Sequence, residues 1–281
     1  MNATVQKSAK LAGTRPQGAR DEHDASARVQ QMFSRIAPRY DFLNHFLSFS
    51  LDHVWRRRTA RRFHEILSRP DARVLDLCCG TGDLAFALER ARRRLSPANR
   101  PPRRAIIGSD FAEPMLDRAR EKAARHSALV SFAAADALHL PFPDAEFDLI
   151  TAAFGFRNLA NYDQGLREFA RVLKQGGEVG ILEFTEPQSG LFASLFRLYF
   201  RHILPRLGGA ISGNREAYAY LPASVSRFPS PPELAQLMQK TGFAEVNWTS
   251  WNFGSVVLHI ARREGPRADA IGGSGEAQKA R

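Results

Sequence analysis

Residues 73–83, RVLDLCCGTGD, constrain the fold most, because an apolar strand runs directly into a turn that carries two glycines. A helix-forming run, residues 84–90, follows the turn. Glycine permits a sharp strand-to-helix turn and lets a ligand approach the backbone closely. Since ligands of open α/β sheets bind at the carboxyl ends of strands, the segment predicts a ligand site at this turn.

Acidic residues beside the turn argue against a phosphate-binding loop. Asp76 and Asp83 flank it, and no lysine follows the second glycine, whereas a P-loop requires Gly-Lys-Ser/Thr. A carboxylate next to a glycine turn suits a cationic ligand or a ribose hydroxyl.

Two further strands end in acidic residues. Residues 105–109 lead to Asp110, which is well placed to hold both hydroxyls of a ribose. A helix N-terminus is the alternative role for Asp110, since Glu113-Pro114 follows and acids favour the first turn. A third strand, residues 130–134, precedes Asp136, and residues 147–152 are expected to form a central strand.

The order of these strands, helices and acids resembles the class I S-adenosylmethionine-dependent methyltransferases. In that family the glycine turn faces the methionine part of the cofactor, the second-strand acid holds the ribose, and the third-strand Asp meets the adenine amino group. The resemblance implies an α/β, Rossmann-like fold: a seven-stranded, mostly parallel sheet with helices on both faces, an N-terminal helical cap and a helical insertion after strand five. It also implies that S-adenosylmethionine is held by Asp76, Gly80, Thr81, Gly82, Asp110, Phe111, Met115, Asp136, Ala137 and Phe154.

The 281 residues are long enough for one large domain with a sizeable core. We expect that domain at residues 26–263, with the helical cap at 26–69 and the insertion at 187–230. Residues 1–25 and 264–281 are rich in Ala, Gly, Ser and charge, which predicts disordered tails.

Later elements follow from periodicity and turn residues. We expect an amphipathic helix at 162–173, a fifth strand at 178–184, a helix at 233–240 and a closing hairpin at 245–250 and 255–262. Residues 191–204 are apolar and aromatic but too short and too charged to span a bilayer. They are open to three interpretations: a core helix, a lid over an apolar substrate, or an interfacial helix.

The net charge of +11 permits contact with nucleic acid or with an anionic membrane. Residues 90–104 hold seven arginines, three prolines and no acid, which indicates a solvated loop, with a phosphate-binding patch as the alternative. No aromatic residue lies among them, which argues against stacking on single-stranded RNA. The chain also lacks an Asn-Pro-Pro-Tyr motif, so we expect no nucleic-acid partner, and a nucleic-acid methyltransferase or binding protein is kept as the alternative from another class.

The two cysteines, Cys78 and Cys79, are adjacent and offer neither a disulfide framework nor a metal set. We expect them to be small buried residues and expect no metal. The sequence shows no apolar signal segment, so we expect a cytoplasmic protein.

Several spaced blocks narrow the family. Tyr40-Asp41-x-x-Asn44-x-x-Leu47-Ser48, followed by His53 and Trp55, and residues 171–177, RVLKQGG, resemble two signatures of the ubiquinone/menaquinone biosynthesis C-methyltransferases. Residues 154–158, FGFRN, resemble a third block of that family. The resemblance covers roughly residues 29–262. One departure is Ala153, where the family commonly has a serine or threonine, which removes one side-chain contact to the cofactor.

The resemblance implies transfer of a methyl group to a ring carbon of a polyprenylated quinol. In its high Arg and Ala usage and its Cys-Cys-Gly-Thr-Gly turn the chain resembles the menaquinone-type relatives more, which implies demethylmenaquinol as the acceptor; a benzoquinol of ubiquinone biosynthesis stays open. A prenylated acceptor implies peripheral contact at the inner face of the membrane. Whether the chain forms a homo-oligomer is left open.

The acceptor carbon becomes nucleophilic when a neighbouring hydroxyl loses its proton, so the site needs a residue that promotes that loss. The candidates are Arg157, Tyr40, His45, Asp148 and His202. Arg157 can stabilise a phenolate or orient a water, but it cannot act as a base at neutral pH. Tyr40 is expected to contact the ring or the sulfonium, and the other three are alternative bases.

Overall fold

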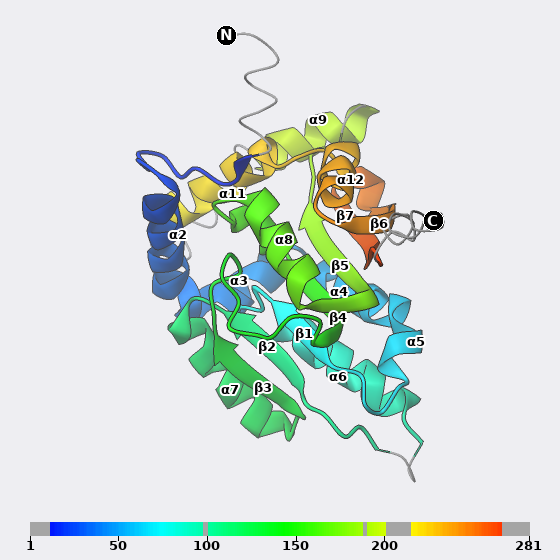
Figure 1. Ribbon diagram of the computed structural model, residues 1–281. Helices are drawn as coiled ribbons and strands as arrows, with labels where there is room; N and C mark the ends of the chain where they lie inside the picture. The colour runs from blue at the N-terminus through cyan, green and yellow to red at the C-terminus, as the bar shows by residue number, and fades with distance from the viewer. Residues whose placement is uncertain (1–11, 98–100, 188–189, 201–214, 266–281) are drawn as a thin grey trace, which may run out of the picture.

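The computed structural model describes residues 12–97, 101–187, 190–200 and 215–265 (Figure 1). Its centre is a seven-stranded sheet in the order β3-β2-β1-β4-β5-β7-β6. Strand β7 runs antiparallel to both of its neighbours, and the other pairings are parallel. The strands are β1 (Val74–Leu77), β2 (Ile106–Asp110), β3 (Val130–Ala134), β4 (Phe147–Ala153), β5 (Leu173–Phe184), β6 (Phe243–Trp251) and β7 (Val256–Arg263).

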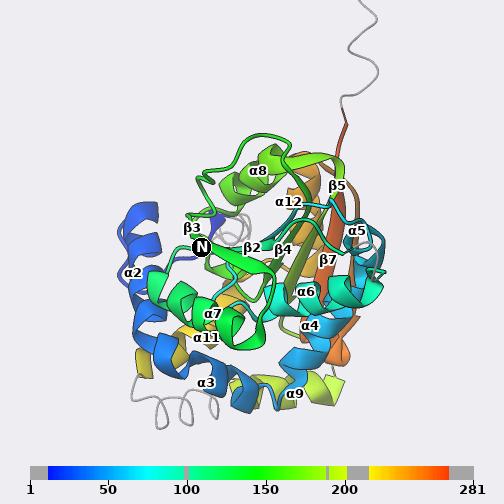
Figure 2. The same ribbon diagram turned by 90° about the horizontal axis from the view of Figure 1, so that it is seen from below.

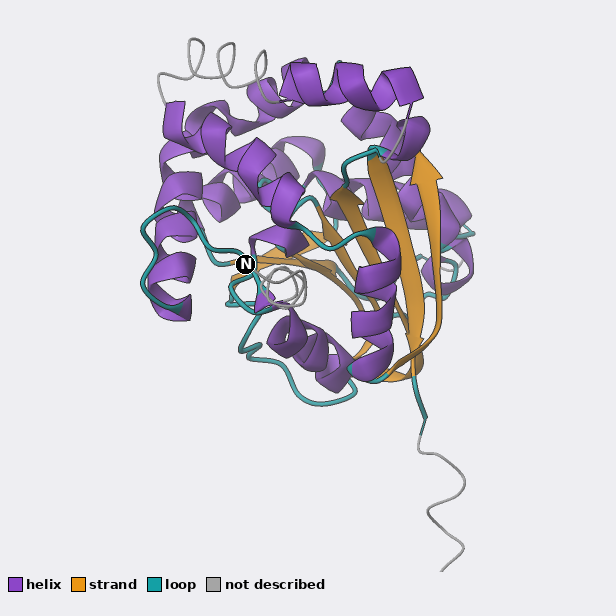
Figure 3. Cartoon of the chain, turned by 90° about the horizontal axis from the view of Figure 1, so that it is seen from above, coloured by secondary structure: helices purple, strands orange, loops and turns teal. Residues whose placement is uncertain are grey.

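Helices cover both faces of the sheet, as predicted (Figure 3). On one face α6 packs against α4 and α5, and on the other face α8 and α12 lie over β5, β6 and β7. Another helix, α7, packs along β2 and β3. These helices are α4 (Leu51–Arg62), α5 (His64–Leu67), α6 (Asp83–Leu95), α7 (Glu113–His126), α8 (Tyr162–Val172) and α12 (Pro231–Lys240).

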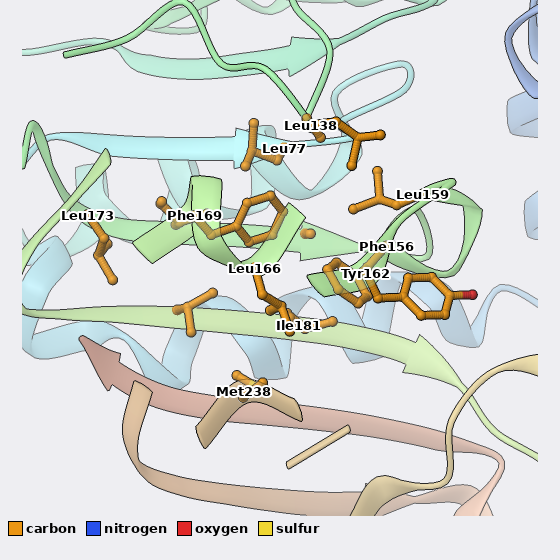
Figure 4. Packing of buried hydrophobic residues seen from close by; sticks show 14 of the residues in the cluster. Leu77, Leu138, Phe156, Leu159, Tyr162, Leu166, Phe169, Leu173, Ile181 and Met238 are labelled. Carbon is orange, nitrogen blue, oxygen red and sulfur yellow. The ribbon is translucent and has the colours of Figure 1, made fainter. Parts of the chain in front are cut away.

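Two features of its sequence make α8 a helix that packs on the sheet: a capping residue and a buried apolar face. Asn161 caps it by accepting a hydrogen bond from the Gln164 N–H at 3.0 Å, which satisfies a free donor of the first turn. Leu166 and Phe169 recur at helical spacing and are fully buried in the core (Figure 4). Burial of each such side chain stabilises the fold by about 1.5–3 kcal/mol. Ile181 of β5 lies in the same cluster.

The cap and the insertion gather around one end of the sheet (Figure 2). Both contribute side chains to one cavity there, described below. The cap begins with α2 (Glu22–Ile36), η1 (Ala37–Arg39) and α3 (Tyr40–Leu47), and the insertion contains α9 (Gly190–Leu198) and α11 (Arg215–Arg227). The described residues also include two further short 3₁₀ turns, η2 (Phe156–Asn158) and η4 (Asn252–Gly254). The predicted hairpin is confirmed, with η4 in its turn.

The predicted tail at 1–25 is wrong for residues 12–25. The Thr14 N–H donates to the Leu159 carbonyl at 2.7 Å, its hydroxyl lies 2.8 Å from that of Tyr220, and Ala25 is fully buried. Backbone and side-chain bonds therefore anchor this segment despite its polar composition. Of the predicted tails, residues 1–11 and 266–281 lie outside the described residues.

The arginine-rich loop predicted at 90–104 is wrong for its first part, because α6 continues to Leu95. Arg92 on this helix is buried, and it donates hydrogen bonds of 2.8–3.0 Å to three carbonyls, those of Pro70, Ala72 and Arg104. By bonding three carbonyls, the Arg92 guanidinium fixes the end of α6 to the segments that precede β1 and β2. The arginine-rich composition did not predict this structural role.

Candidate active site

Two adjoining cavities open at the carboxyl ends of β1, β2 and β4. Phe33, Tyr40 and Phe154 line both of them and form the boundary. We call the cavity beside Asp110 the cofactor cavity, and the other, with a volume of ≈ 420 Å³, the acceptor cavity. Seven predicted cofactor residues line the cofactor cavity: Gly80, Asp110, Phe111, Met115, Asp136, Ala137 and Phe154.

Asp110 is held rigidly at the tip of β2. Its Oδ2 accepts from the Gly80 N–H and its Oδ1 from the Ala112 N–H, both at 2.9 Å. Burial raises the pKa of Asp110, and these backbone donors oppose the rise. The alternative role at a helix N-terminus is thus also present, because Ala112 is the cap residue of α7. Asp110 lines the cofactor cavity as well, so one carboxylate serves both purposes.

Three residues at this edge of the sheet have a positive φ, which only glycine adopts without strain. Gly80 lies in the left-handed region, at φ +55°, beside the ring of Tyr40. Cys78 and Phe154 also have positive φ, at 52° and 58°, although such a conformation costs a non-glycine residue on the order of 1–3 kcal/mol. A Cβ on Gly155 would overlap the Cβ of Cys78. The turns after β1 and β4 therefore touch directly beneath the cofactor cavity.

Three residues predicted to contact the cofactor do not line the cavity. Thr81 donates to Asp41 and accepts from Lys122 at 3.0 Å, so its hydroxyl is already paired. Gly82 packs against two phenylalanine rings. Asp76 is fully buried and accepts from the Thr151 hydroxyl at 2.7 Å. The described contacts of these three residues are with the protein, so they stabilise the glycine turn.

The chain's residues fit the nucleoside-bearing cofactor that the sequence implied. The carboxylate of Asp110 lies at one side of the cavity, and Asp136 follows β3, with its Oδ1 fixed by the Leu138 N–H at 2.9 Å. Phe111 and Met115 supply apolar walls. Asp110 can hold the ribose of the cofactor. The apolar walls and Asp136 can hold its adenine, and the backbone at Gly80 can hold its methionine part.

The acceptor cavity is largely aromatic and apolar. Its walls come from the cap, from α9, from α11 and from the ends of β4 and β5. The apolar lining residues are Met32, Phe33, Ile36, Phe49, Leu51, Trp55, Phe154, Phe184, Leu195, Phe196, Phe200 and Leu221. Phe196 and Phe200 stack at 4.6 Å between ring centroids. Four residues of the segment predicted at 191–204 line this cavity: Leu195, Phe196, Tyr199 and Phe200. Phe200 is buried and Leu195 is exposed. Residues 201–204 lie outside the described chain.

Arg157 lies at the acceptor cavity and is almost fully buried. It forms an ion pair with Glu183 of β5 at 3.0 Å and donates to the Phe154 carbonyl. Burial acts to lower the pKa of Arg157, but Glu183 outweighs it, so the guanidinium stays charged. Arg157 can therefore attract a developing negative charge in the cavity.

Tyr40 stands at the boundary of the two cavities, as its predicted role requires. Burial raises the pKa of its phenol, so it is a hydrogen-bond donor rather than a base. His45 and Asp148 are not brought to either cavity. Asp148 lies at the opposite end of β4 and pairs with Lys174 at 2.8 Å. His45 lies 2.8 Å from Asp52 and does not itself line the acceptor cavity, and His202 lies outside the described residues.

Sequence reasoning missed two charged residues of the acceptor cavity, Asp52 and Arg56. They form an i,i+4 ion pair on α4 and are both buried. The available signal was their i,i+4 spacing on either side of His53 and Trp55. Such pairs usually lie on a solvated helix face, so the spacing alone did not point to a cavity.

The strand order, the acid at the tip of β2 and the two joined cavities define a Rossmann-like methyltransferase. A solved S-adenosylmethionine-dependent methyltransferase from Thermotoga maritima has the same fold, with a TM-score of 0.57 at 18% identity over 84% of this chain and 100% of its own. The model of the ubiE/COQ5 methyltransferase family matches residues 21–263, and the chain belongs to that family. S-adenosylmethionine is accordingly the methyl donor, as predicted.

Three relatives are similar in sequence over most of this chain. A demethylmenaquinone methyltransferase of Deinococcus radiodurans is 51% identical over 223 residues, which cover 79% of this chain and 88% of the relative. One of the same description from Thermus thermophilus is 47% identical over 232 residues, which cover 83% and 100%. A ubiquinone/menaquinone biosynthesis C-methyltransferase of Geobacter sulfurreducens is 42% identical, over 84% of this chain and 88% of its own length.

Proposed function

We propose that this methyltransferase methylates a ring carbon of demethylmenaquinol to give menaquinol, the quinol of menaquinone. The observation that carries the proposal is the aromatic acceptor cavity, which joins the cofactor cavity at Tyr40 and Phe154. A flat aromatic ring fits between phenylalanine walls, and an apolar tail fits the continuation toward α9. The descriptions of the two relatives at 51% and 47% identity support a naphthoquinol over a benzoquinol.

Bound S-adenosylmethionine supplies an electrophilic methyl group on a positively charged sulfur. The chain has to hold the acceptor carbon close to that methyl and to favour the ring's ionised form. Alignment of the two reactants can contribute about 7–11 kcal/mol to the barrier reduction at best. Because Tyr40 lines both cavities, the methyl group and the acceptor carbon should come together beside it. The Arg157 charge, held by Glu183 in an apolar setting, stabilises a ring oxygen that loses its proton.

The proposal extends to the membrane surface, because the prenylated acceptor resides there. No helix in the described part of the chain is long and apolar enough to cross a bilayer. At the mouth of the acceptor cavity, Phe49 is 76% and Leu195 55% exposed. Exposed arginines follow on α4 at positions 57, 58 and 61. Apolar side chains beside a basic helix face suit the surface of an anionic bilayer.

The experiment supplies the purified chain with methyl-labelled S-adenosylmethionine and either demethylmenaquinol or the matching benzoquinol, each in the same detergent. Mass spectrometry then follows the gain of one methyl group. We expect the naphthoquinol to be methylated faster. Equal or preferred use of the benzoquinol would reassign the acceptor, and no methylation of either would overturn the proposed reaction.

The membrane part is tested separately. Sedimentation with anionic and with neutral vesicles should show binding to the anionic ones, weakened by salt. The double substitution Phe49→Ser and Leu195→Ser should reduce that binding. If the chain binds neither kind of vesicle, the membrane part is wrong while the reaction in detergent is unaffected. Cytoplasmic location and the oligomeric state stay predictions.

A further inference from the structure

Asp52 carries the only carboxylate among the described residues that line the acceptor cavity. The same lining contains no histidine or lysine. Its other ionisable groups are the arginines 56 and 157, which stay protonated, and the tyrosines 40, 199 and 220, in each of which burial raises the phenol pKa. Asp52 is therefore the one group there that can accept a proton near neutral pH.

Among the described residues, three donors hold the carboxylate of Asp52 and do not saturate it. Ser48 donates to Oδ1 at 2.9 Å, while His45 Nδ1, at 2.8 Å, and Arg56 contact Oδ2. An ionised carboxylate offers about four lone-pair positions, so one acceptor position remains. Ser48 lines the acceptor cavity too, which puts the Oδ1 side of the carboxylate next to the space for the acceptor.

Charge around Asp52 keeps it ionised. Burial acts to raise the pKa of Asp52, but Arg56, Ser48 and His45 outweigh it and hold the pKa below its usual range. Arg56 in turn lies 3.7 Å from Asp83 of α6. Although His45, Asp52 and His53 could be grouped as ligands of a cation, the two imidazole rings stack at 4.2 Å and Arg56 already compensates the carboxylate. The geometry favours proton transfer over metal binding.

We propose, building on the quinol acceptor proposed above, that Asp52 is a catalytic residue that takes the proton of the acceptor hydroxyl. The O–H bond breaks, its electron pair stays on the ring oxygen, and the proton bonds to Asp52. The ring carbon then bonds to the methyl carbon as the bond between that carbon and sulfur breaks, with its electron pair left on sulfur. When the C–H bond at the methylated carbon breaks and its proton goes to water, Asp52 returns its own proton to the ring oxygen. One proton is released in total.

The test compares Asp52→Asn with the wild-type protein on the acceptor that the wild type methylates. A general base contributes about 10²–10⁴-fold, so we expect kcat to fall by that factor with little change in KM or in cofactor affinity. The decisive readout is the pH profile. Wild-type kcat should be flat around neutral pH, whereas kcat of the variant should rise about tenfold per pH unit, because solvent hydroxide must then remove the proton.

The matched control is Glu89→Gln. Glu89 is also a buried carboxylate in an i,i+4 pair, with Arg93 at 2.5 Å, and it does not line the acceptor cavity. We expect it to keep the wild-type rate and profile. A flat profile and near wild-type kcat in Asp52→Asn would overturn the proposal. If that variant does not fold, Asp52→Glu decides: it keeps a carboxylate for Arg56 but displaces it, so we expect kcat at least tenfold lower, and wild-type kcat would overturn the proposal. Failure of the wild type itself to methylate any quinol would refute the proposed function instead.

Discussion

The buried carboxyl of Asp76 should make the stability of the protein fall as pH rises. Its side chain is fully buried behind the glycine turn, and its Oδ2 has no hydrogen-bond partner among the described residues. Burial raises the pKa of Asp76 to about 7, although the Thr151 hydroxyl opposes the rise. A folded-state pKa above the unfolded value means that the native state binds the extra proton. The stability that this proton contributes is complete below the unfolded pKa of about 4 and is lost as pH rises through about 7.

The magnitude follows from linkage. Between about pH 5 and about pH 6 the unfolding free energy should fall by about 1.4 kcal/mol per pH unit through this group. The slope should be about half as steep near pH 7 and level off by about pH 8, for a total near 2.5 kcal/mol between pH 5 and pH 8. The change Asp76→Asn removes the titration and keeps an oxygen for Thr151 to bond. Urea unfolding of both proteins without cofactor should show the variant gaining relative stability by that amount across this range.

The control is Asp148→Asn. Burial acts to raise the pKa of Asp148, but Lys174 and the backbone of Arg73 outweigh it and hold the pKa low. This carboxyl is ionised in both states above about pH 5, so its difference from wild type should not change over the range. A pH-independent difference between Asp76→Asn and wild type would refute the reasoning that burial dominates at the turn.

Three further outcomes are expected. Asp110→Ala should weaken S-adenosylmethionine binding by tenfold or more in calorimetry, since a hydrogen bond to a charged group contributes about 1.5–3 kcal/mol; unchanged affinity would remove Asp110 from the site. Phe196→Ser with Phe200→Ser should raise KM for a tailed quinol and spare a tailless one, and equal losses with a lower Tm would mean core packing. Gly155→Ala should cost about 1–3 kcal/mol in urea unfolding, because the new methyl overlaps Cys78; wild-type stability would show that the turns can separate.

The sequence predicted the sheet and the cofactor cavity better than the acceptor cavity. Asp110 and Asp136 could be placed because each follows a strand, and parallel strands end at one edge. The acceptor cavity is built by contacts that are remote in sequence. Phe49 meets the ring of Tyr199 at 6.3 Å, and Trp55 donates to Asn252 at 2.9 Å. Periodicity identifies an apolar helix face but not the partner that covers it. The resemblance put Tyr40 and Arg157 near the acceptor, but the sequence did not show which other side chains line the cavity.

The positions of charged side chains were also hard to predict from the sequence. His45 and Asp148 carry the right chemistry for a base, yet the fold turns His45 toward Asp52 and puts Asp148 at the far end of β4. Arg92 was assigned to a solvated loop, whereas three backbone carbonyls hold it inside the protein. Which of many ionisable side chains becomes buried depends on tertiary packing, and a single sequence carries little information about it.

The most direct test of the proposed function is the quinone profile of a menaquinone-producing bacterium that lacks its own methyltransferase of this family. The deletion strain receives this chain, the Asp110→Ala variant, or an empty vector, with protein levels checked in each. Demethylmenaquinone should be consumed and menaquinone restored by the wild-type chain and not by the variant. Persistence of demethylmenaquinone beside a well-expressed, folded wild-type chain would contradict the account.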